Sequence, residues 1–241
     1  MFSKLASRVS AGLRGWAGHI PSQCAVCHAW PAQRICEACR ARFSGLQRRC
    51  TTCALLLVTD TPQCGACLRT SPRLDLCLAG VEYGYPWAQA IAQFKFQGDP
   101  GWAVALAQLL LDNPAAAQAL HAADWVLPVP LSHQRLRERG FNQALLLARQ
   151  LAPQKTSASL LLRLQHTPAQ SSLARAQRLH NLDGAFAIEP LHLAQLRGKR
   201  VVLVDDVMTT GSTLHAAAQA LRQAAVQHVT GMVVARTGRH S

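Results

Sequence analysis

The sequence has few acidic and few aromatic side chains. Its 241 residues contain 12 Asp and Glu against 25 Lys and Arg, a formal charge of +13 with histidine neutral, and aromatic residues make up 5%. The shortage of acids favours phosphate-rich partners such as nucleotides, sugar phosphates or nucleic acid, although a basic surface can also serve solubility alone. The shortage of aromatics argues against a strong platform for stacking the bases of a single strand.

Long apolar runs are also missing. One of the longest, residues 102–111, falls well short of the roughly 20 residues that cross a bilayer, so we expect no membrane span. The N-terminus is basic and mildly amphipathic but lacks the continuous apolar region of a secretory signal. We therefore expect a cytoplasmic protein. Residues 1–19 form a basic segment that is either a short surface helix or frayed leader, or a contact for a partner or a membrane surface.

Cysteine, by contrast, is abundant and concentrated. Eight of the nine cysteines fall within 44 residues as four C-x-x-C pairs. Two thiolates on one such turn bind one side of a tetrahedral ion, and a second pair completes a four-sulfur site, so four pairs predict two structural zinc sites. Disulfides are not expected without a secretion signal, and a redox C-x-x-C usually occurs once. The pairs are Cys24/Cys27, Cys36/Cys39, Cys50/Cys53 and Cys64/Cys67.

The spacing allows two ways of combining these pairs. In chain order the first two pairs form one site and the last two the other, which suits two short zinc ribbons in tandem. A crossed arrangement joins the first pair with the third and the second with the fourth. We favour chain order. Both arrangements use four protein ligands and leave no open position for catalysis. Residues 20–78 are too few to build an apolar core, so we expect metal binding to stabilise their fold in its place. The ninth cysteine, Cys77, lies outside the pairs and is interpreted as an ordinary buried thiol.

From residue 79 onward cysteines stop, and strand-like and helical segments alternate. Alternation of this kind predicts an α/β domain over residues 79–241, with a mostly parallel sheet flanked by helices. We expect strands at residues 79–85, 124–131, 158–164, 199–204 and 228–236, and helices at residues 86–98, 101–113, 141–152 and 212–225.

The stretch VVLVDDVMTTGSTL, residues 201–214, joins an apolar strand to a helix. A glycine among small hydroxyl residues at the start of a helix can bind a monophosphate through backbone N–H groups. Asp205 and Asp206 can accept hydrogen bonds from vicinal hydroxyls or face a hydrated Mg²⁺. A Walker B strand is an alternative, but no G-x-x-x-x-G-K-[ST] occurs. A plain strand-to-helix turn would not need two carboxylates.

This stretch resembles the 5-phosphoribosyl-1-diphosphate (PRPP) binding motif of type I phosphoribosyltransferases. The whole chain resembles the ComF/GntX-like family, which joins a double zinc ribbon to such a domain. The resemblance rests on the cysteines, on Tyr85–Pro86 with FKFQG (94–98), on VPVPL with RERGFNQA (127–144), and on residues 163–186. Together these segments cover nearly the full length.

The resemblance implies roles for particular residues. The acids would contact the ribose hydroxyls, and the loop after them the 5-phosphate. The segment from Pro130 to Ser132 matches the position where the family fold holds pyrophosphate, with Arg135, Arg139 and Asn142 nearby. A mobile segment that closes over PRPP would include Arg163 and Arg178, and the catalytic residues would be Asp205, Asp206 and Arg178. The full PRPP set is Asp205, Asp206, Val207, Met208, Thr209, Thr210, Gly211, Ser212, Thr213, Pro130, Leu131, Arg135, Arg139 and Arg163, and the mobile segment adds Thr167, Gln170 and Asn181.

Three functions remain open at this stage. The first is phosphoribosyl transfer from Mg²⁺-bound PRPP to an unidentified nitrogenous acceptor. The second is a nucleic-acid accessory role, because members of the family are linked with DNA uptake in natural competence or with nutrient use; single-stranded DNA and proteins of the competence machinery would then be partners. The third is a PRPP-sensing adaptor without turnover. Lys95 is either a phosphate contact or a solvated helix terminus, and Arg163 can equally be an ordinary charge at a strand end.

Overall fold

The computed structural model describes residues 22–70, 73–164 and 184–238. These residues form two compact units that divide after Gly45. The basic segment 1–19 and the residues predicted to close over a ligand, Arg178 among them, lie outside the described residues. Within the described part of the chain, no helix is long and apolar enough to cross a membrane.

The smaller unit is built around the first four cysteines. A single antiparallel bridge joins Ser22 to Ala32, and the chain then enters the short helix α2, Glu37–Phe43. Cys36 is the N-cap of this helix, and its sulfur accepts a hydrogen bond from the backbone N–H of Cys39. Local turns of this kind bury little apolar surface, so the unit depends on its sulfur cluster.

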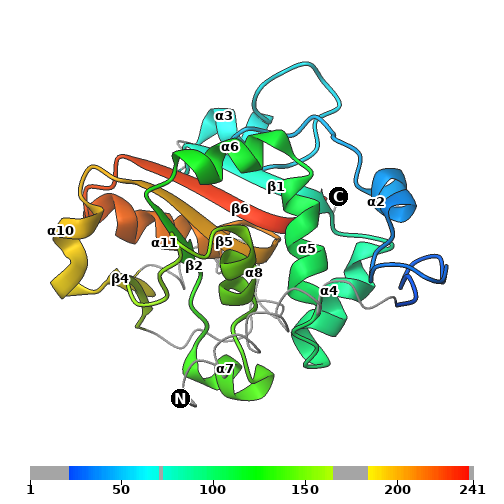
Figure 1. Cartoon of the computed structure of the whole chain (residues 1–241). Coiled ribbons are helices and arrows are strands. Elements are labelled where there is room, and N and C mark those ends of the chain that lie inside the picture. Colours follow the sequence, from blue (N-terminus) through cyan, green and yellow to red (C-terminus); the bar gives the residue numbers. More distant parts are fainter. Residues whose placement is uncertain (1–21, 71–72, 165–183, 239–241) are drawn as a thin grey trace, which may run out of the picture. The chain divides into compact units, whose positions relative to one another are not determined.

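Four parallel strands form the central sheet of the larger unit, in the order β1-β6-β5-β2 (Figure 1). Their bounds are β1 Leu76–Glu82, β2 Trp125–Pro128, β5 Arg200–Met208 and β6 His228–Arg236. The two central strands, β5 and β6, are buried along almost their whole length, because helices cover both faces. The predicted α/β class with a parallel sheet is confirmed.

Helices lie on both sides of this sheet. They are α4 Trp87–Phe96, α5 Trp102–Leu111, α6 Pro114–Ala122, α7 His133–Arg139, α8 Gln143–Leu151 and α11 Ser212–Gln223. Helix α6 faces Val202 and Thr230 across a small cavity, whereas α11 shares a core with Val201 and Val229. Successive strand residues point to opposite faces, so α6 and α11 cover opposite faces of the sheet.

The second group of four cysteines belongs to the larger unit. Cys50, Cys53 and Cys64 are buried in the same apolar core as Cys77 of β1 and Leu214 of α11. A short helix, α3 Gly65–Arg69, follows Cys64. The compact units divide after Gly45, so the second cysteine group lies in the same unit as the sheet. The domain boundary that the sequence analysis placed near residue 78 stays a prediction.

Several elements differ from the sequence-based expectations. Strand β5 does not end before the two acids but continues through them to Met208, because β6 pairs with it along its full length. Strand β1 begins three residues before position 79, at Leu76. Elements that were not predicted are α6, α7, β4 Phe186–Ile188, which pairs antiparallel with β3 Leu161–Arg163, the 3-10 turn η2 Pro190–His192, and α10 Leu193–Leu196. All but α6 have seven residues or fewer, which is too few for a periodic pattern, whereas α6 is as long as the predicted α8.

Candidate functional site

The two acids occupy the carboxyl end of β5, at the edge of the sheet where ligands of open α/β folds usually bind. Because neighbouring strand residues point to opposite faces, the two carboxylates have different surroundings. Asp206 is buried, and one of its oxygens lies 2.7 Å from Nζ of Lys95 in α4. Asp205 as a whole is half-buried, but protein atoms surround its carboxylate, which accepts a hydrogen bond of 2.8 Å from the backbone N–H of Asp206.

Of the two alternatives that the sequence left open for Lys95, the solvated helix terminus is wrong, and a phosphate contact stays a prediction. Lys95 is 18% exposed and forms a short ion pair with Asp206, which is 8% exposed. An ion pair this deep fixes the direction of the Asp206 carboxylate and keeps its charge compensated. No local pattern in the sequence could have found it, because the partners come from α4 and β5, far apart along the chain.

Replacing Lys95 with Met should lower the free energy of unfolding by about 3 kcal/mol, because Asp206 would be left buried without its cation. Urea unfolding of wild type and variant near neutral pH measures the difference. The double variant Lys95→Met/Asp206→Asn should recover most of the loss, since it leaves no stranded charge. Equal stability of Lys95→Met and wild type would show that the pair does not form.

The charge of Asp205 is unfavourable in the ligand-free protein. Burial, followed by the negative charge of Asp206, raises the pKa of Asp205 to about 7, and the cations Lys95 and Arg139 only partly oppose this. A carboxyl group with a raised pKa in a cleft is a frequent mark of a binding or catalytic site. A ligand that brings a cation or donates hydrogen bonds here would favour the ionised form.

The variant Asp205→Asn should therefore be more stable than wild type at alkaline pH. The pKa of Asp205 in the folded state lies above its value of about 3.9 in the unfolded chain. The free energy of unfolding of wild type therefore falls as pH rises towards 7. Melting curves at about pH 5 and about pH 8 should show the advantage of the variant growing by about 2–3 kcal/mol over this interval.

Asp124→Asn is the matched control for this pH dependence. A hydrogen bond from the backbone of Arg200, and then Lys199, holds the pKa of Asp124 below its ordinary value. Asp124 is therefore ionised in both the folded and the unfolded chain from pH 5 to 8, and the difference in stability between Asp124→Asn and wild type should not vary over this range. A pH-independent difference for Asp205→Asn as well would contradict the raised pKa.

The loop after β5, residues 209–213, leads into the first turn of α11. Gly211 has φ +83°, which glycine adopts without strain, and a Cβ at this position would collide with the Met208 side chain. The hydroxyls of Thr210 and Ser212 lie 2.8 Å apart. Backbone N–H groups at the start of a twelve-residue helix then face the same space. The phosphate contact that the sequence predicted for these residues stays a prediction, and these donors are the groups that it would use.

Arginine side chains surround the acids from two other segments. Arg139 of α7 is close enough to lower the pKa of Asp205. Arg163 at the end of β3 has a pKa lowered first by burial and then by Arg135, while Asp205 acts in the opposite direction. The structure thus brings Arg139 and Arg163 into the electrostatic neighbourhood of Asp205, and Arg135 into that of Arg163, so that these arginines can bind a polyanion.

The segment between β2 and α8 is held in shape by caps. Ser132, which follows Pro130 and Leu131, is the N-cap of α7 and accepts a hydrogen bond from the N–H of Arg135. Asn142 is the N-cap of α8, and its amide donates to the carbonyl of Val129 at 3.1 Å. These contacts assign Ser132 and Asn142 to the scaffold of the loop.

Gln143 was missed by the sequence-based reasoning. It is buried, accepts a hydrogen bond of 3.1 Å from Arg139, and its amide nitrogen has no partner among the described residues. A buried donor without an acceptor is unusual. The first position of a helix carries no sequence signal that separates such a glutamine from a solvated one.

Four residues assigned from the resemblance have no position to report. Arg178, Thr167, Gln170 and Asn181 lie outside the described residues. Val207 and Met208 belong to β5 itself, so they are part of the strand and not of the loop.

The eight paired cysteines form two clusters in chain order, not in the crossed arrangement. Within each cluster all four sulfurs lie within 4.8 Å of one another. The sulfurs of Cys27 and Cys36 are 3.6 Å apart, and those of Cys53 and Cys64 are 3.7 Å apart. Four thiolates bound at about 2.3 Å to a tetrahedral Zn²⁺ would be separated by about 3.8 Å. The donor set and its spacing therefore fit structural zinc in both clusters.

Backbone N–H groups also point at these sulfurs. Cys24 accepts from the N–H groups of Val26 and Cys36, at 3.5 and 3.4 Å. In the second cluster Cys50 accepts from the N–H of Cys64 at 3.3 Å. Such contacts stabilise the thiolate form that binds metal.

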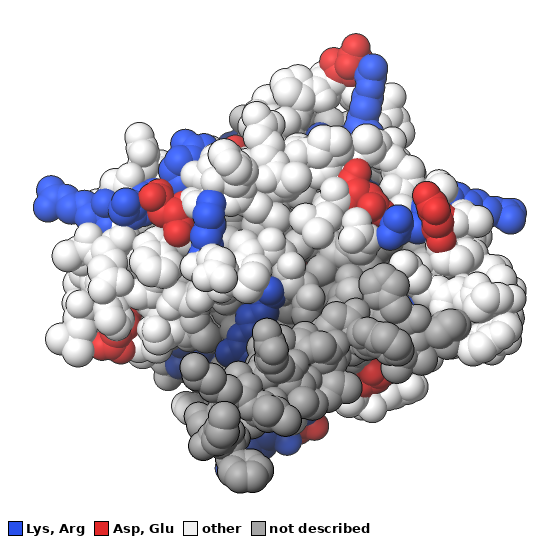
Figure 2. Space-filling model, in the orientation of Figure 1, with Lys and Arg blue, Asp and Glu red and all other residues white. Residues whose placement is uncertain are grey.

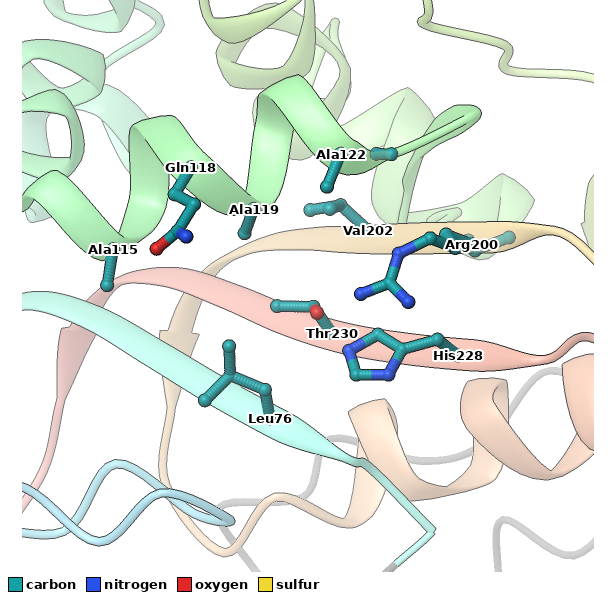
Figure 3. Close-up of a pocket in the computed structure, with 11 residues that line it drawn as sticks. Leu76, Ala115, Gln118, Ala119, Ala122, Arg200, Val202, His228 and Thr230 are labelled. Atoms are coloured by element: carbon teal, nitrogen blue, oxygen red, sulfur yellow. The ribbon is translucent and has the colours of Figure 1, made fainter.

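A separate cavity of about 230 Å³ lies at the other edge of the sheet (Figure 3). It is lined by α6 and by the first residues of β1, β5 and β6, with Arg200, His228 and Thr230 at its polar side. Because the strands are parallel, this cavity is at the end opposite the two acids, and it takes no part in the site described above.

Comparisons with known proteins agree with this geometry. A family model described as the phosphoribosyl transferase domain matches residues 139–240. The chain is 33% identical to competence protein F of Haemophilus influenzae, over 84% of this chain and 90% of the relative. It is 31% identical to DNA utilization protein YhgH of Escherichia coli K12, over 84% and 91%, and 30% identical to competence protein ComFC of Bacillus subtilis, over 79% of each chain.

Proposed function

The chain belongs to the ComF/YhgH family and contains a phosphoribosyl transferase domain, and on this basis we propose that it binds PRPP with Mg²⁺ and transfers the phosphoribosyl group to a nitrogenous acceptor. The observation that carries the proposal is the junction at the end of β5. There, two carboxylates precede a hydroxyl-rich loop at the start of a helix. These two groups of donors and acceptors suit a ligand that carries both a diol and a phosphate, as ribose 5-phosphate does.

Each group in the site has a part in this reaction. Asp205 and Asp206 would accept hydrogen bonds from the ribose hydroxyls, and the 209–213 loop would bind the 5-phosphate. Arg135, Arg139 and Arg163 would stabilise the charge on the departing pyrophosphate. Bound Mg²⁺ would supply further charge neutralisation on the diphosphate.

The chemical step is a substitution at C1 of the ribose. The bond from C1 to the pyrophosphate oxygen breaks, and its electron pair leaves with pyrophosphate. A bond forms from the acceptor nitrogen to C1, and the nitrogen loses a proton. In the transition state C1 of the ribose resembles an oxocarbenium ion. Positioning of the reactants and electrostatic stabilisation would therefore supply most of the catalysis.

Calorimetric titration of PRPP into the protein, with and without Mg²⁺, tests the binding step. We expect micromolar affinity that depends on Mg²⁺. Release of pyrophosphate in the presence of candidate nitrogen nucleophiles tests transfer. Tight PRPP binding without release of pyrophosphate from PRPP in the presence of any acceptor would favour a PRPP-responsive adaptor over an enzyme.

A second candidate is an accessory protein that binds single-stranded DNA. The names of the relatives, DNA utilization protein and competence protein, favour a connection with DNA. On the face drawn in Figure 2, however, basic side chains are spread out and several lie beside acidic ones. If the candidate is correct, an electrophoretic titration at low salt should give a shift whose log–log salt slope is about −0.7 per phosphate contacted.

A further inference from the structure

Arg236, the last residue of β6, is buried and bonded to three backbone segments. Its Nε donates to the carbonyl of Cys53, in the turn of the second cysteine cluster, at 2.9 Å. One terminal nitrogen donates to the carbonyls of Met208, at 3.1 Å, and Thr209. The same nitrogen reaches the carbonyl of Thr237 at 2.8 Å. A single guanidinium therefore joins the second cluster to the start of the 209–213 loop.

The charge of Arg236 needs compensation that carbonyls do not supply. Among the described residues no carboxylate lies within ion-pair distance of it, and a buried cation without an anion is costly. Four thiolates around Zn²⁺ would carry a net charge of −2 next to it. Arg49 lies beside the same cluster, and it donates to the carbonyl of Ala54 at 3.1 Å. Arg49 also lies in the field of Glu82, whereas for Arg236 the second cluster, when it holds metal, supplies the nearby negative charge.

A second contact supports the loop from the same side. The thiol of Cys77 lies 3.6 Å from the sulfur of Met208. The Met208 methyl group, in turn, fills the space where a side chain at Gly211 would lie. The backbone N–H of Cys77 donates to the carbonyl of Thr51, between two ligands of the cluster, at 2.7 Å. The second cluster therefore supports the 209–213 loop through Thr51, Cys77 and Met208.

We propose that Arg236 is a positioning residue that couples the metal state of the second cysteine cluster to the 209–213 loop. With metal bound, the Cys53 turn is rigid and Arg236 holds the loop in the shape that binds phosphate. Loss of the metal frees the Cys53 carbonyl and the loop together. This inference rests on the proposed function in so far as the loop's ligand is the 5-phosphate of PRPP.

The test compares Arg236→Lys and Arg236→Met with wild type. The lysine keeps the charge but cannot bridge three segments, and the methionine removes both features. Arg222→Met is the matched control, because Arg222 bonds to Asp75 and to the Val226 and Gln227 carbonyls, away from the loop. Zinc per chain, hydrogen exchange of residues 205–213 and calorimetric PRPP affinity are measured for each protein.

We expect Arg236→Lys to retain two zinc ions per chain, to exchange amide hydrogens faster at residues 205–213, and to bind Mg²⁺–PRPP at least about tenfold more weakly. Arg222→Met should match wild type in all three. Wild-type exchange and affinity in both Arg236 variants would overturn the proposal.

A chelator experiment separates this inference from the proposed function. In the early steps of chelation, before the sheet unfolds, removal of zinc from wild type should accelerate exchange at residues 205–213 ahead of exchange in β6, whereas in Arg236→Lys the exchange at residues 205–213 should start fast and change little until the sheet unfolds. This readout needs no ligand, so it decides the coupling even if wild type does not bind PRPP. Protection that persists in the wild-type loop after both metals are removed would overturn the coupling.

Discussion

The double variant Asp205→Asn/Asp206→Asn should lose at least about 100-fold in affinity for Mg²⁺–PRPP while remaining folded. Each carboxylate would accept charge-assisted hydrogen bonds worth roughly 1.5–3 kcal/mol, and two such losses exceed the 2.7 kcal/mol that corresponds to 100-fold. Asparagine keeps the shape and can still accept a hydrogen bond from Lys95. Calorimetric titration of wild type and variant measures the change.

Two further proteins make this result specific. Asp124→Asn removes a carboxylate near the opposite end of β5, where it contacts Lys199 and the backbone of Arg200. Its affinity for Mg²⁺–PRPP should equal that of wild type. Hydrogen exchange over β5 and β6 verifies that the double variant is folded. Unchanged affinity in a folded double variant would remove Asp205 and Asp206 from the ligand site and with them the basis of the proposed function.

Loss of the second cysteine cluster should prevent folding of the parallel sheet, whereas loss of the first should not. The variant Cys53→Ser/Cys64→Ser removes two ligands that are buried in the main core. A structural zinc site contributes on the order of 10 kcal/mol, which is comparable to the whole stability of a domain. The expected result is a chain without a cooperative melting transition by circular dichroism.

The matched variant Cys24→Ser/Cys39→Ser removes two buried ligands from the other compact unit. It should bind one zinc ion per chain in place of two and keep the melting temperature of the sheet within a few degrees, because none of its cysteines belongs to the main core. Zinc content and melting curves of the two variants are compared directly. Similar melting curves for both would show that the second cluster does not support the sheet.

Short-range patterns were sufficient for the features whose residues are neighbours in the chain. A C-x-x-C pair forms one turn, so its ability to bind metal is readable from spacing alone. The same holds for the loop at residues 209–213, where Gly211 and the hydroxyl residues next to it define a helix start. The alternation of strands and helices was readable as well, because a buried parallel strand such as β5 is a continuous apolar run.

The sequence by itself determined the four C-x-x-C turns, the class of the fold and the helix start at the 209–213 loop. Only the tertiary structure decided which of these parts contact one another. It paired Lys95 with Asp206, extended β5 through both acids, and placed Arg236 between the Cys53 turn and the loop. These contacts join residues far apart along the chain, and their partners are chosen by strand order and by the burial of charge, for which a single sequence carries no local pattern.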